Sequence, residues 1–265
     1  MSPPSLLRRR LWTAGKLPRR RPSVGRMRVR LGDGARTTLH VAGYDRRAFE
    51  ARVVVLERPV PLVRWCGVEG VHDAVVGGFF SRPEYVPLGE VQIDGQAQPS
   101  LAFDPPWGDV RACVQITNGE LRIARRDQLG AAPAGDLLQA GPMLVAGGEM
   151  AVVPGQDPEG FSAGARQFDS DITQGRYPRA ALAVARESLL LVACDGRTHR
   201  DAGMTLLELA RVLAKLGASD ALNLDGGGSA SLVCDGRLRN RPREEHGVDL
   251  LEGRAIVTAI ALRAR

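Results

Sequence analysis

The sequence predicts an α+β fold: one domain built on a mixed, largely antiparallel sheet core with a few packed helices. Most patterned segments are short apolar runs of strand type, separated by turn residues. Only one long segment, residues 204–217, repeats its apolar residues at helical spacing. A chain of 265 residues with 44% hydrophobic content is also long enough to bury one sizeable core.

The first half of the chain predicts strands almost throughout. The expected elements are a hairpin over residues 28–41, a strand over 51–57, a short helix over 62–68, and a strand over 72–80 that ends in Gly77-Gly78-Phe79-Phe80. Residues 86–126 follow as antiparallel strands, because turn signals divide them at Asp94-Gly95, Asp104-Pro105-Pro106 and Asn118-Gly119. The Asn-Gly pair is the strongest hairpin signal of the three.

The second half alternates strands with one long irregular segment. Residues 137–145 predict a strand broken at Gly141-Pro142, and residues 146–175 predict a loop of a length that is usually functional. Residues 179–185 and 188–194 predict two further strands, and the second ends at Asp195. The final strand is expected directly after Arg254.

The one strong helix prediction lies between these strands. Thr205 can act as N-cap with Glu208 three residues later, which is a capping box. An apolar stripe through Leu209 and Leu213 gives the helix a buried face, and Gly217 is placed to end it.

Residues 221–233, ALNLDGGGSASLV, follow this helix and hold the main candidate site. A short buried strand over 220–224 ends at Asp225, three glycines follow, and a second strand is expected over 229–234. Glycines leave the backbone N–H groups open to a ligand beside the carboxylate, which suits anion binding. The same pattern also fits a plain hairpin turn, and the segment alone supports both interpretations equally.

Charge is concentrated at the N-terminus. Residues 1–30 hold nine Arg and one Lys without an acidic residue, a charge of +10, so that the other 235 residues sum to −4 within the net +6. Residues 1–27 are therefore expected to be a disordered basic leader that is dispensable for activity, and residues 28–265 the folded domain. Nucleic-acid binding is indicated by this leader alone.

Other composition features predict a cytoplasmic protein. The first 30 residues lack the apolar core of a secretory signal, and no apolar run reaches transmembrane length. The four cysteines, Cys66, Cys113, Cys194 and Cys234, are far apart and read as buried reduced thiols. No oligomeric state is indicated.

Several common catalytic motifs are absent from the sequence. There is no P-loop, and the segment Gly227–Ser231 lacks the final glycine of a nucleophile elbow. The four histidines have no metal-ligand spacing. Asp195, Asp225 and Asn223 could offer oxygen ligands to a hard cation, but the spacing does not require one. We therefore expect no metal and no cofactor.

Arginines near the predicted strand starts suggest a phosphate clamp. Arg179 and Arg254 each open a strand, and Arg197 follows Asp195 by two residues. A guanidinium group matches phosphate geometry, although each of these residues alone would read as a surface arginine.

A set of segments in fixed order then points to a known family. They are Gly77-Gly78-Phe79-Phe80, Ala140-Gly141-Pro142, Tyr177-Pro178-Arg179, Asp195-Gly196-Arg197, residues 203–210, Leu216-Gly217, residues 221–229, Asn240-Arg241-Pro242 and Arg254. In order and spacing they resemble the phosphodiester glycosidase domain family over residues 50–263. The block at 221–229, which follows a capped helix, is the most specific of them.

The resemblance implies hydrolysis of a sugar-1-phosphodiester to a free sugar and a phosphomonoester. The expected partner is a sugar phosphate or a glycan, such as an exopolysaccharide. Asp225 is the expected catalytic carboxylate, with Asp195 as a second carboxylate or an orienting group; the two roles are interchangeable on the sequence. The residues expected to bind substrate are Gly77, Gly78, Phe79, Arg179, Arg197, Asn223, Gly226, Gly227, Gly228, Ser229, Asn240 and Arg254.

Two positions depart from the family pattern. Val76 stands where the family usually has Asn, and Ala180 stands where it usually has Thr. Both lost groups are polar and are expected to face the site, so that the substrate differs from that of the family or activity is weak. A rival interpretation follows, in which the chain is a non-catalytic glycan- or polymer-binding module that kept the fold.

Overall fold

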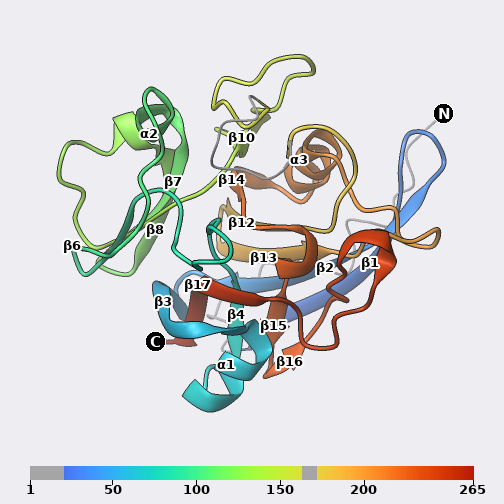
Figure 1. Ribbon diagram of the computed structural model, residues 1–265, viewed down its shortest axis with the longest axis horizontal. Coiled ribbons are helices and arrows are strands. Elements are labelled where there is room, and N and C mark those ends of the chain that lie inside the picture. The colour runs from blue at the N-terminus through green and yellow to red at the C-terminus, as the bar shows by residue number, and fades with distance from the viewer. Residues whose placement is uncertain (1–20, 163–171) are drawn as a thin grey trace.

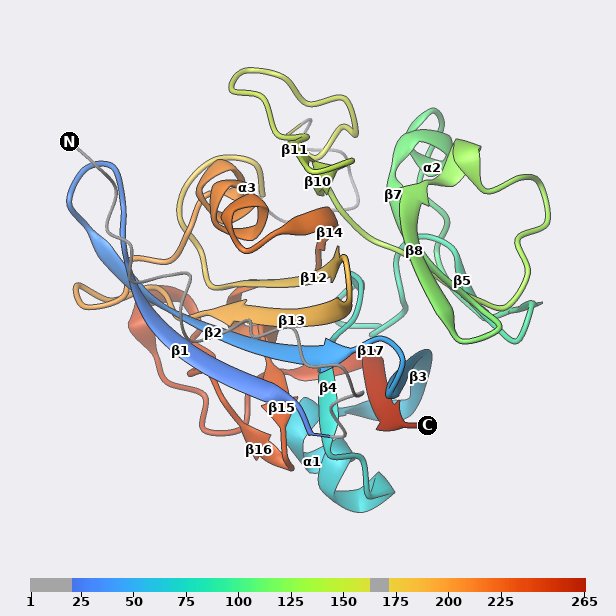
Figure 2. The ribbon, with the colours of Figure 1, turned by 180° about the vertical axis from the view of Figure 1, so that it is seen from behind.

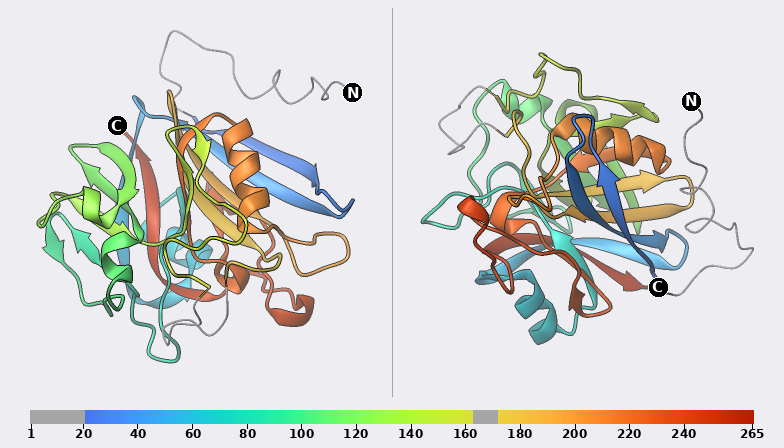
Figure 3. Two further views of the ribbon diagram at one scale, coloured as in Figure 1. Left: turned by 90° about the horizontal axis from the view of Figure 1, so that it is seen from above. Right: turned by 90° about the vertical axis from the view of Figure 1, so that its right-hand side faces the viewer.

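The structure is a computed structural model, and it describes residues 21–162 and 172–265. Two large sheets pack face to face, and a smaller third sheet lies at one end of the molecule (Figure 1; Figure 3). Every ladder between the named strands of the described residues is antiparallel, and a single isolated parallel bridge joins Leu88 to Leu101. The α+β prediction is therefore confirmed, but the sheets are antiparallel rather than mixed.

The first sheet has seven strands, and it contains the two strands that lead to Asp195 and Asp225. Its order is β1 (Ser23–Arg30), β2 (Arg36–Asp45), β13 (Ser188–Cys194), β12 (Arg179–Ala185), β14 (Ala218–Asn223), β10 (Met143–Ala146) and β11 (Glu149–Met150). Strands β12 and β13 are buried at every position, which explains their continuous apolar sequences. The expected hairpin is β1–β2, which is prominent in the view from behind (Figure 2). Strand β1 begins at Ser23, so the domain starts earlier than residue 28; residues 1–20 of the expected leader lie outside the described residues.

The second sheet packs under the first, and the third is attached through β9. The second sheet runs β16 (Arg237–Leu238), β15 (Leu232–Cys234), β4 (Asp73–Val76), β17 (Ala255–Ala264) and β3 (Phe49–Pro61). The third runs β6 (Gln96–Ala97), β5 (Val91–Ile93), β9 (Asp136–Gln139), β7 (Ala112–Thr117) and β8 (Glu120–Arg125). The break predicted at Gly141-Pro142 is the point at which the chain passes from β9 in the third sheet to β10 in the first.

Three α-helices cover these sheets within the described residues: α1 (Leu62–Glu69), α2 (Trp107–Val110) and α3 (Leu206–Lys215). Helix α3 lies on the face of the first sheet that is opposite the second sheet, and α1 lies under the second sheet (Figure 1). Leu206, Leu209, Ala210 and Leu213 of α3 are buried, as the apolar stripe predicts. No helix in the part of the chain that the structure describes is long and apolar enough to cross a membrane.

The predicted capping box at the start of α3 is present. The Glu208 N–H donates to Thr205 Oγ1 at 3.1 Å, and the Thr205 N–H donates to Glu208 Oε2 at 2.9 Å. We expect Thr205→Ala to lower the free energy of unfolding by about 0.5–2 kcal/mol, because two helix-terminal N–H groups depend on this pair. Denaturant unfolding measures the effect, and Thr205→Ser, which keeps the hydroxyl, should stay close to the wild type. An alanine variant as stable as the serine variant would contradict the assignment.

Candidate functional site

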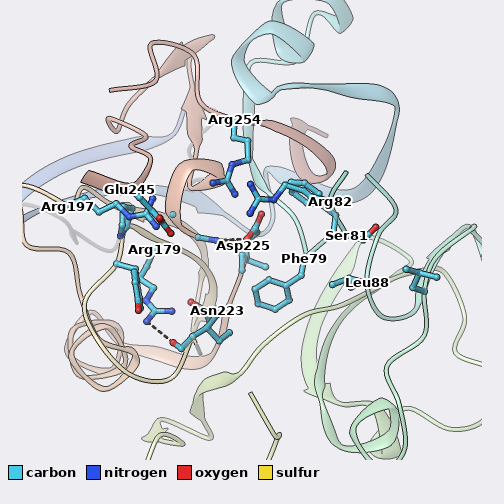
Figure 4. A pocket seen from close by; sticks show the side chains of 18 of the residues that line it. Phe79, Ser81, Arg82, Leu88, Arg179, Arg197, Asn223, Asp225, Glu245 and Arg254 are labelled. Atoms are coloured by element: carbon cyan, nitrogen blue, oxygen red, sulfur yellow. Dashed lines mark hydrogen bonds between the residues drawn. The ribbon is translucent and has the colours of Figure 1, made fainter. Parts of the chain in front are cut away.

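A cavity of about 500 Å³ opens where strand ends from the two large sheets meet the loops that follow them. It is lined by Phe79, Phe80, Ser81, Arg82, Glu84, Leu88, Leu101, Ile172, Tyr177, Pro178, Arg179, Arg197, Asn223, Leu224, Asp225, Gly226, Gly227, Glu245 and Arg254. Figure 4 shows Asp225 at the centre, with Arg254 and Arg82 on one side and Phe79 and Asn223 on the other.

Asp225 is held by backbone contacts to both large sheets. It lies two residues after the end of β14, and its N–H donates to the Gly77 carbonyl at 3.0 Å, just beyond β4. Its Oδ1 accepts from the Gly226 N–H at 2.8 Å. The glycine block after it forms a short 3₁₀ turn, Gly227–Ser229, and leads into β15 of the second sheet. The block is therefore a crossover between two sheets, and the hairpin interpretation is wrong.

Burial raises the pKa of Asp225 to about 6, against the opposing effects of Ser229, the Gly226 N–H and the positive charges of Arg254 and Arg82. The Ser229 hydroxyl is buried beside the carboxylate without a hydrogen bond of ordinary geometry to any described residue. A buried carboxylate with a raised pKa, in a cavity with cationic neighbours, is a functional-site signature.

Two of the three glycines are required by close contacts, and the third by its backbone conformation. A Cβ at Gly226 would lie 2.9 Å from the Pro178 carbonyl oxygen, and one at Gly228 would lie 2.7 Å from a carboxylate oxygen of Glu244. Gly227 has φ +59°, a left-handed conformation that favours glycine. The glycines thus bring the chain close to two neighbouring loops, and they keep two of the three residues, Gly226 and Gly227, at the cavity wall.

Arg254 and Arg197 reach the cavity from opposite loops and share an acidic partner. Arg254 Nε donates to Glu244 Oε1 at 2.7 Å, and its Nη2 donates to Glu244 Oε2 at 2.5 Å. Arg197 Nη1 donates to the Arg243 carbonyl at 2.8 Å and lies 3.8 Å from Glu244 Oε2. The arginine cluster predicted as a phosphate clamp is therefore assembled, with a counter-ion behind it.

Arg179 lies deeper in the wall than the other two. Its side chain donates through Nε to the Met204 carbonyl at 3.1 Å and through Nη2 to the Ile172 carbonyl at 2.8 Å. Its guanidinium carbon lies 5.2 Å from the centre of the Tyr177 ring. Arg179 thus fixes the loop that carries Ile172 and Tyr177, in addition to bringing a positive charge to the cavity.

Asn223 and Phe79 form part of the neutral side of the cavity. Asn223 Nδ2 donates to the Gly141 carbonyl at 2.8 Å, and its Oδ1 is buried without a hydrogen-bond partner among the described residues. The Phe79 ring packs on Phe161, with 5.7 Å between ring centres. A sugar ring can be accommodated on such a neutral, partly aromatic surface.

Asp195 is brought near the site but not into the cavity. It does not line the cavity, and both of its carboxylate oxygens are engaged. Oδ2 lies 3.2 Å from His40 Nε2, and Oδ1 accepts from the Arg241 N–H at 2.7 Å. These contacts tie β13 to the loop after β16. The geometry therefore fits Asp195 as an orienting group, and its carboxylate does not face the cavity.

Five other predicted binding residues support the site from behind the cavity wall. Asn240 bridges the backbone of β15, because its Nδ2 donates to the Ala230 carbonyl and its Oδ1 accepts from the Leu232 N–H. Gly77 and Gly78 have no room for a side chain, since a Cβ would lie 2.4 Å from Thr258 Oγ1 and 2.9 Å from the Gln139 carbonyl, respectively. Gly228 and Ser229 are buried in the crossover turn.

The two departures from the family pattern do not face the cavity. Val76 and Ala180 are fully buried and pack within the main hydrophobic core, where the two large sheets meet. The expectation that both positions point into the site is therefore wrong for this chain. Alternating strand geometry turns their side chains into the core, although the neighbouring residues Phe79 and Arg179 do line the cavity.

Sequence reasoning missed the residues that the loops contribute. Arg82, Glu84, Tyr177 and Glu245 line the cavity, together with the apolar side chains Leu88, Leu101 and Ile172. Arg82 stands two residues after the Gly-Gly-Phe-Phe segment, and that closeness is the only sequence signal for it. Loop residues far apart in the chain gather only when the fold is complete.

Metal-type ligands gather elsewhere in the described residues. Asp73, Cys234 and Asp235 offer ligand atoms within 4.8 Å of one another, at the end of β4 that is away from Gly77. Asp73 Oδ1 accepts hydrogen bonds from the Tyr44 hydroxyl at 2.8 Å and from the Asp235 N–H at 3.2 Å. All four cysteines are buried free thiols, as expected.

Comparison with known proteins decides the family. A family model described as phosphodiester glycosidase matches residues 69–263. The chain belongs to the phosphodiester glycosidase family. Within this family it is 29% identical, over 221 residues, to the N-acetylglucosamine-1-phosphodiester alpha-N-acetylglucosaminidase of Mus musculus. That match covers 82% of this chain but 41% of the mouse protein, so the chain spans about two fifths of the length of this relative.

A second relative and two solved structures are also similar to this chain. The same enzyme of Bos taurus is 43% identical over 56 residues, which are 21% of this chain and 10% of the relative. The zebrafish enzyme's catalytic domain superposes with a TM-score of 0.69 at 21% identity, over 92% of this chain and 83% of that one. A hypothetical protein from Synechocystis gives a TM-score of 0.65 at 20% identity, over 92% of this chain and 62% of that one. At these identities the two structures show that the fold is shared.

Proposed function

We propose that this chain hydrolyses a sugar-1-phosphodiester to the free sugar and a phosphomonoester. The observation that carries the proposal is the placement of Asp225: a strand-end carboxylate with a raised pKa, between an arginine side and a neutral side of one cavity. The mouse and zebrafish relatives are named for N-acetylglucosamine-1-phosphodiester, so a phosphodiester of this sugar is the first substrate to test.

The two sides of the cavity match the two halves of such a substrate. A phosphomonoester is a good leaving group, so the reaction needs charge stabilisation more than a strong general acid. Arg254 and Arg197 supply positive charge there, and the backbone around Gly226 and Gly227 lies at the same wall. The sugar would lie toward Phe79 and Asn223, which leaves its anomeric carbon near Asp225 as base or nucleophile.

The test is a turnover assay on purified full-length chain. An N-acetylglucosamine-1-phosphodiester with a simple alkyl group on the phosphate is incubated with the protein, and phosphorus NMR follows the conversion of diester to monoester. Release of free sugar in equal amount supports the proposal. Conversion without free sugar would mean cleavage on the other side of the phosphorus and would contradict it.

The pH dependence follows from the pKa of Asp225. As base or nucleophile Asp225 must be ionised, so kcat/KM should rise about tenfold per pH unit below pH 6 and become flat above it. A general-acid role predicts the opposite slope. Rates measured from pH 4.5 to 8 decide between them, and the profile of Asp225→Asn should lack the acid limb.

The rival function, a non-catalytic glycan- or polymer-binding module, rested on Val76 and Ala180. Because both side chains are in the core, they remove no polar group from the cavity. Binding of the test substrate without turnover would nevertheless establish the module instead of the enzyme.

A further inference from the structure

Glu244 joins two of the cavity arginines, Arg254 and Arg197, and nothing in the sequence points to it. Its carboxylate accepts both N–H groups on one edge of the Arg254 guanidinium, at 2.7 Å and 2.5 Å. The same Oε2 atom lies 3.8 Å from Arg197 Nη1. Both arginines line the cavity and Glu244 does not, so its negative charge lies behind the cationic wall.

The surrounding backbone fixes this carboxylate in place. The Glu244 N–H donates to the Val248 carbonyl at 2.9 Å, and the Gly247 N–H donates to the Glu244 carbonyl at 3.2 Å. The Arg254 N–H donates to the Gly228 carbonyl at 2.9 Å. Gly228 in turn has no side chain at the place where the carboxylate lies, since a Cβ there would be 2.7 Å from it. The turn after Asp225 is thus shaped around Glu244.

The charge balance gives Glu244 a role beyond packing. Arg254, Arg197 and Arg82 are the charged groups that face Glu244, and the hydrogen bonds from Arg254, opposed by burial, hold the pKa of Glu244 below its usual range. Glu244 is therefore ionised at neutral pH. Without it, a phosphomonoester dianion would meet a wall with one more net positive charge, and would leave that wall more slowly.

We propose that Glu244 is a positioning residue and built-in counter-ion that limits how tightly the arginine wall holds phosphate. It directs one edge of Arg254 away from the cavity and offsets part of the charge of Arg254 and Arg197. The consequence is a site that stabilises developing negative charge during reaction but releases the phosphomonoester product. This inference rests on the proposed function, because product release matters only if the chain is an enzyme. Phosphate binding itself can be measured without turnover.

The test compares Glu244→Gln with Glu252→Gln, a matched control two residues before Arg254 in the chain. Glu252 loses the same charge, but it does not line the cavity and pairs with the exposed Arg64. Inorganic phosphate is titrated into each protein by calorimetry, and phosphate inhibition of turnover is measured in parallel. We expect Glu244→Gln to bind phosphate about three- to tenfold more tightly, with product inhibition strengthened by the same factor, and Glu252→Gln to change less than twofold.

A second readout separates this role from simple loss of structure. Arg254 and Arg82 face Asp225, so removing the charge of Glu244 exposes Asp225 to more of the positive charge of Arg254. The acid limb of the pH–rate profile should therefore move to lower pH in Glu244→Gln and stay in place in Glu252→Gln. A damaged loop would weaken phosphate binding and leave the limb where it was.

The outcomes are distinguishable from those of the proposed function. Tighter phosphate binding in Glu244→Gln without turnover of any sugar phosphodiester would keep the inference and reject the enzyme. Unchanged or weaker phosphate binding in a folded Glu244→Gln protein, or no phosphate binding by the wild type, overturns the inference even if turnover is normal.

Discussion

Replacing Asp225 by Asn is expected to lower kcat by about a hundredfold or more, and to raise the melting temperature at neutral pH. The loss of activity follows because Asn cannot act as base or nucleophile at the anomeric carbon. The shape is retained, since Asn Oδ1 can still accept from the Gly226 N–H as Asp225 does at 2.8 Å. An activity loss accompanied by a gain in stability is the signature of a residue kept for chemistry.

The gain in stability follows from the pKa of Asp225. Folding raises this pKa from 3.8 to about 6, so the folded protein holds the proton more tightly than the unfolded chain. Stability therefore falls as pH rises between about 4 and 6, and above pH 6 the ionised group carries the full cost, on the order of 1–3 kcal/mol. Asparagine removes that cost, which at about 2–4 °C per kcal/mol is measurable by thermal unfolding.

The matched control is Asp220→Asn, within β14, the strand that precedes Asp225. Asp220 accepts only from the Gly147 N–H, at 3.2 Å, among the hydrogen bonds of the described residues, and it is not in the cavity. Its turnover should stay within a few-fold of the wild type. The stability difference between wild type and Asp225→Asn should vanish near pH 4. If Asp225→Asn melts lower at pH 7.5 and keeps its turnover, the carboxylate is structural and the assignment is wrong.

Local sequence signals predicted the parts of the fold that depend on local chemistry. The capping box at Thr205 and Glu208 forms as the sequence predicts, because both partners lie within one helical turn. The Asn118-Gly119 hairpin joins β7 to β8, with φ of 53° and 77° at its two turn residues. The resemblance also located Asp225, since its signal is one uninterrupted block.

Properties that depend on which face a strand presents were not predictable in the same way. Val76 and Ala180 are close in sequence to segments of the site, which predicts that their side chains face it. The packing of the two large sheets nevertheless places both in the core. Asp195 ends a strand as Asp225 does, but His40 of β2 and the Arg241 N–H occupy its carboxylate. The partner of Arg254 could not be chosen either, because Glu244 and Glu245 are adjacent and only the folded loop selects between them.

Arg254→Lys is expected to lower kcat by about tenfold to a thousandfold, the second large effect on activity. Lysine keeps one positive charge, but it has no planar fork that can hold both oxygens of Glu244 and still face the cavity. The departing phosphate then loses an oriented donor at the moment when its charge develops, which is the kind of loss that costs most in a buried site. Steady-state kinetics should show the change mainly in kcat, with a smaller change in KM.

Arg263→Lys is the matched control, because Arg263 lies near the far end of β17, which begins directly after Arg254. Arg263 pairs with Glu50 at 2.5 Å, but its side chain is 70% exposed, so exchange of its charged group should leave both turnover and stability close to the wild type. A leaving group of lower basicity offers the deciding measurement. If Arg254 stabilises the departing phosphate, an aryl phosphodiester should recover much of the activity that Arg254→Lys loses on an alkyl phosphodiester. An equal loss on both substrates would instead assign Arg254 to holding the loop of Glu244 in place.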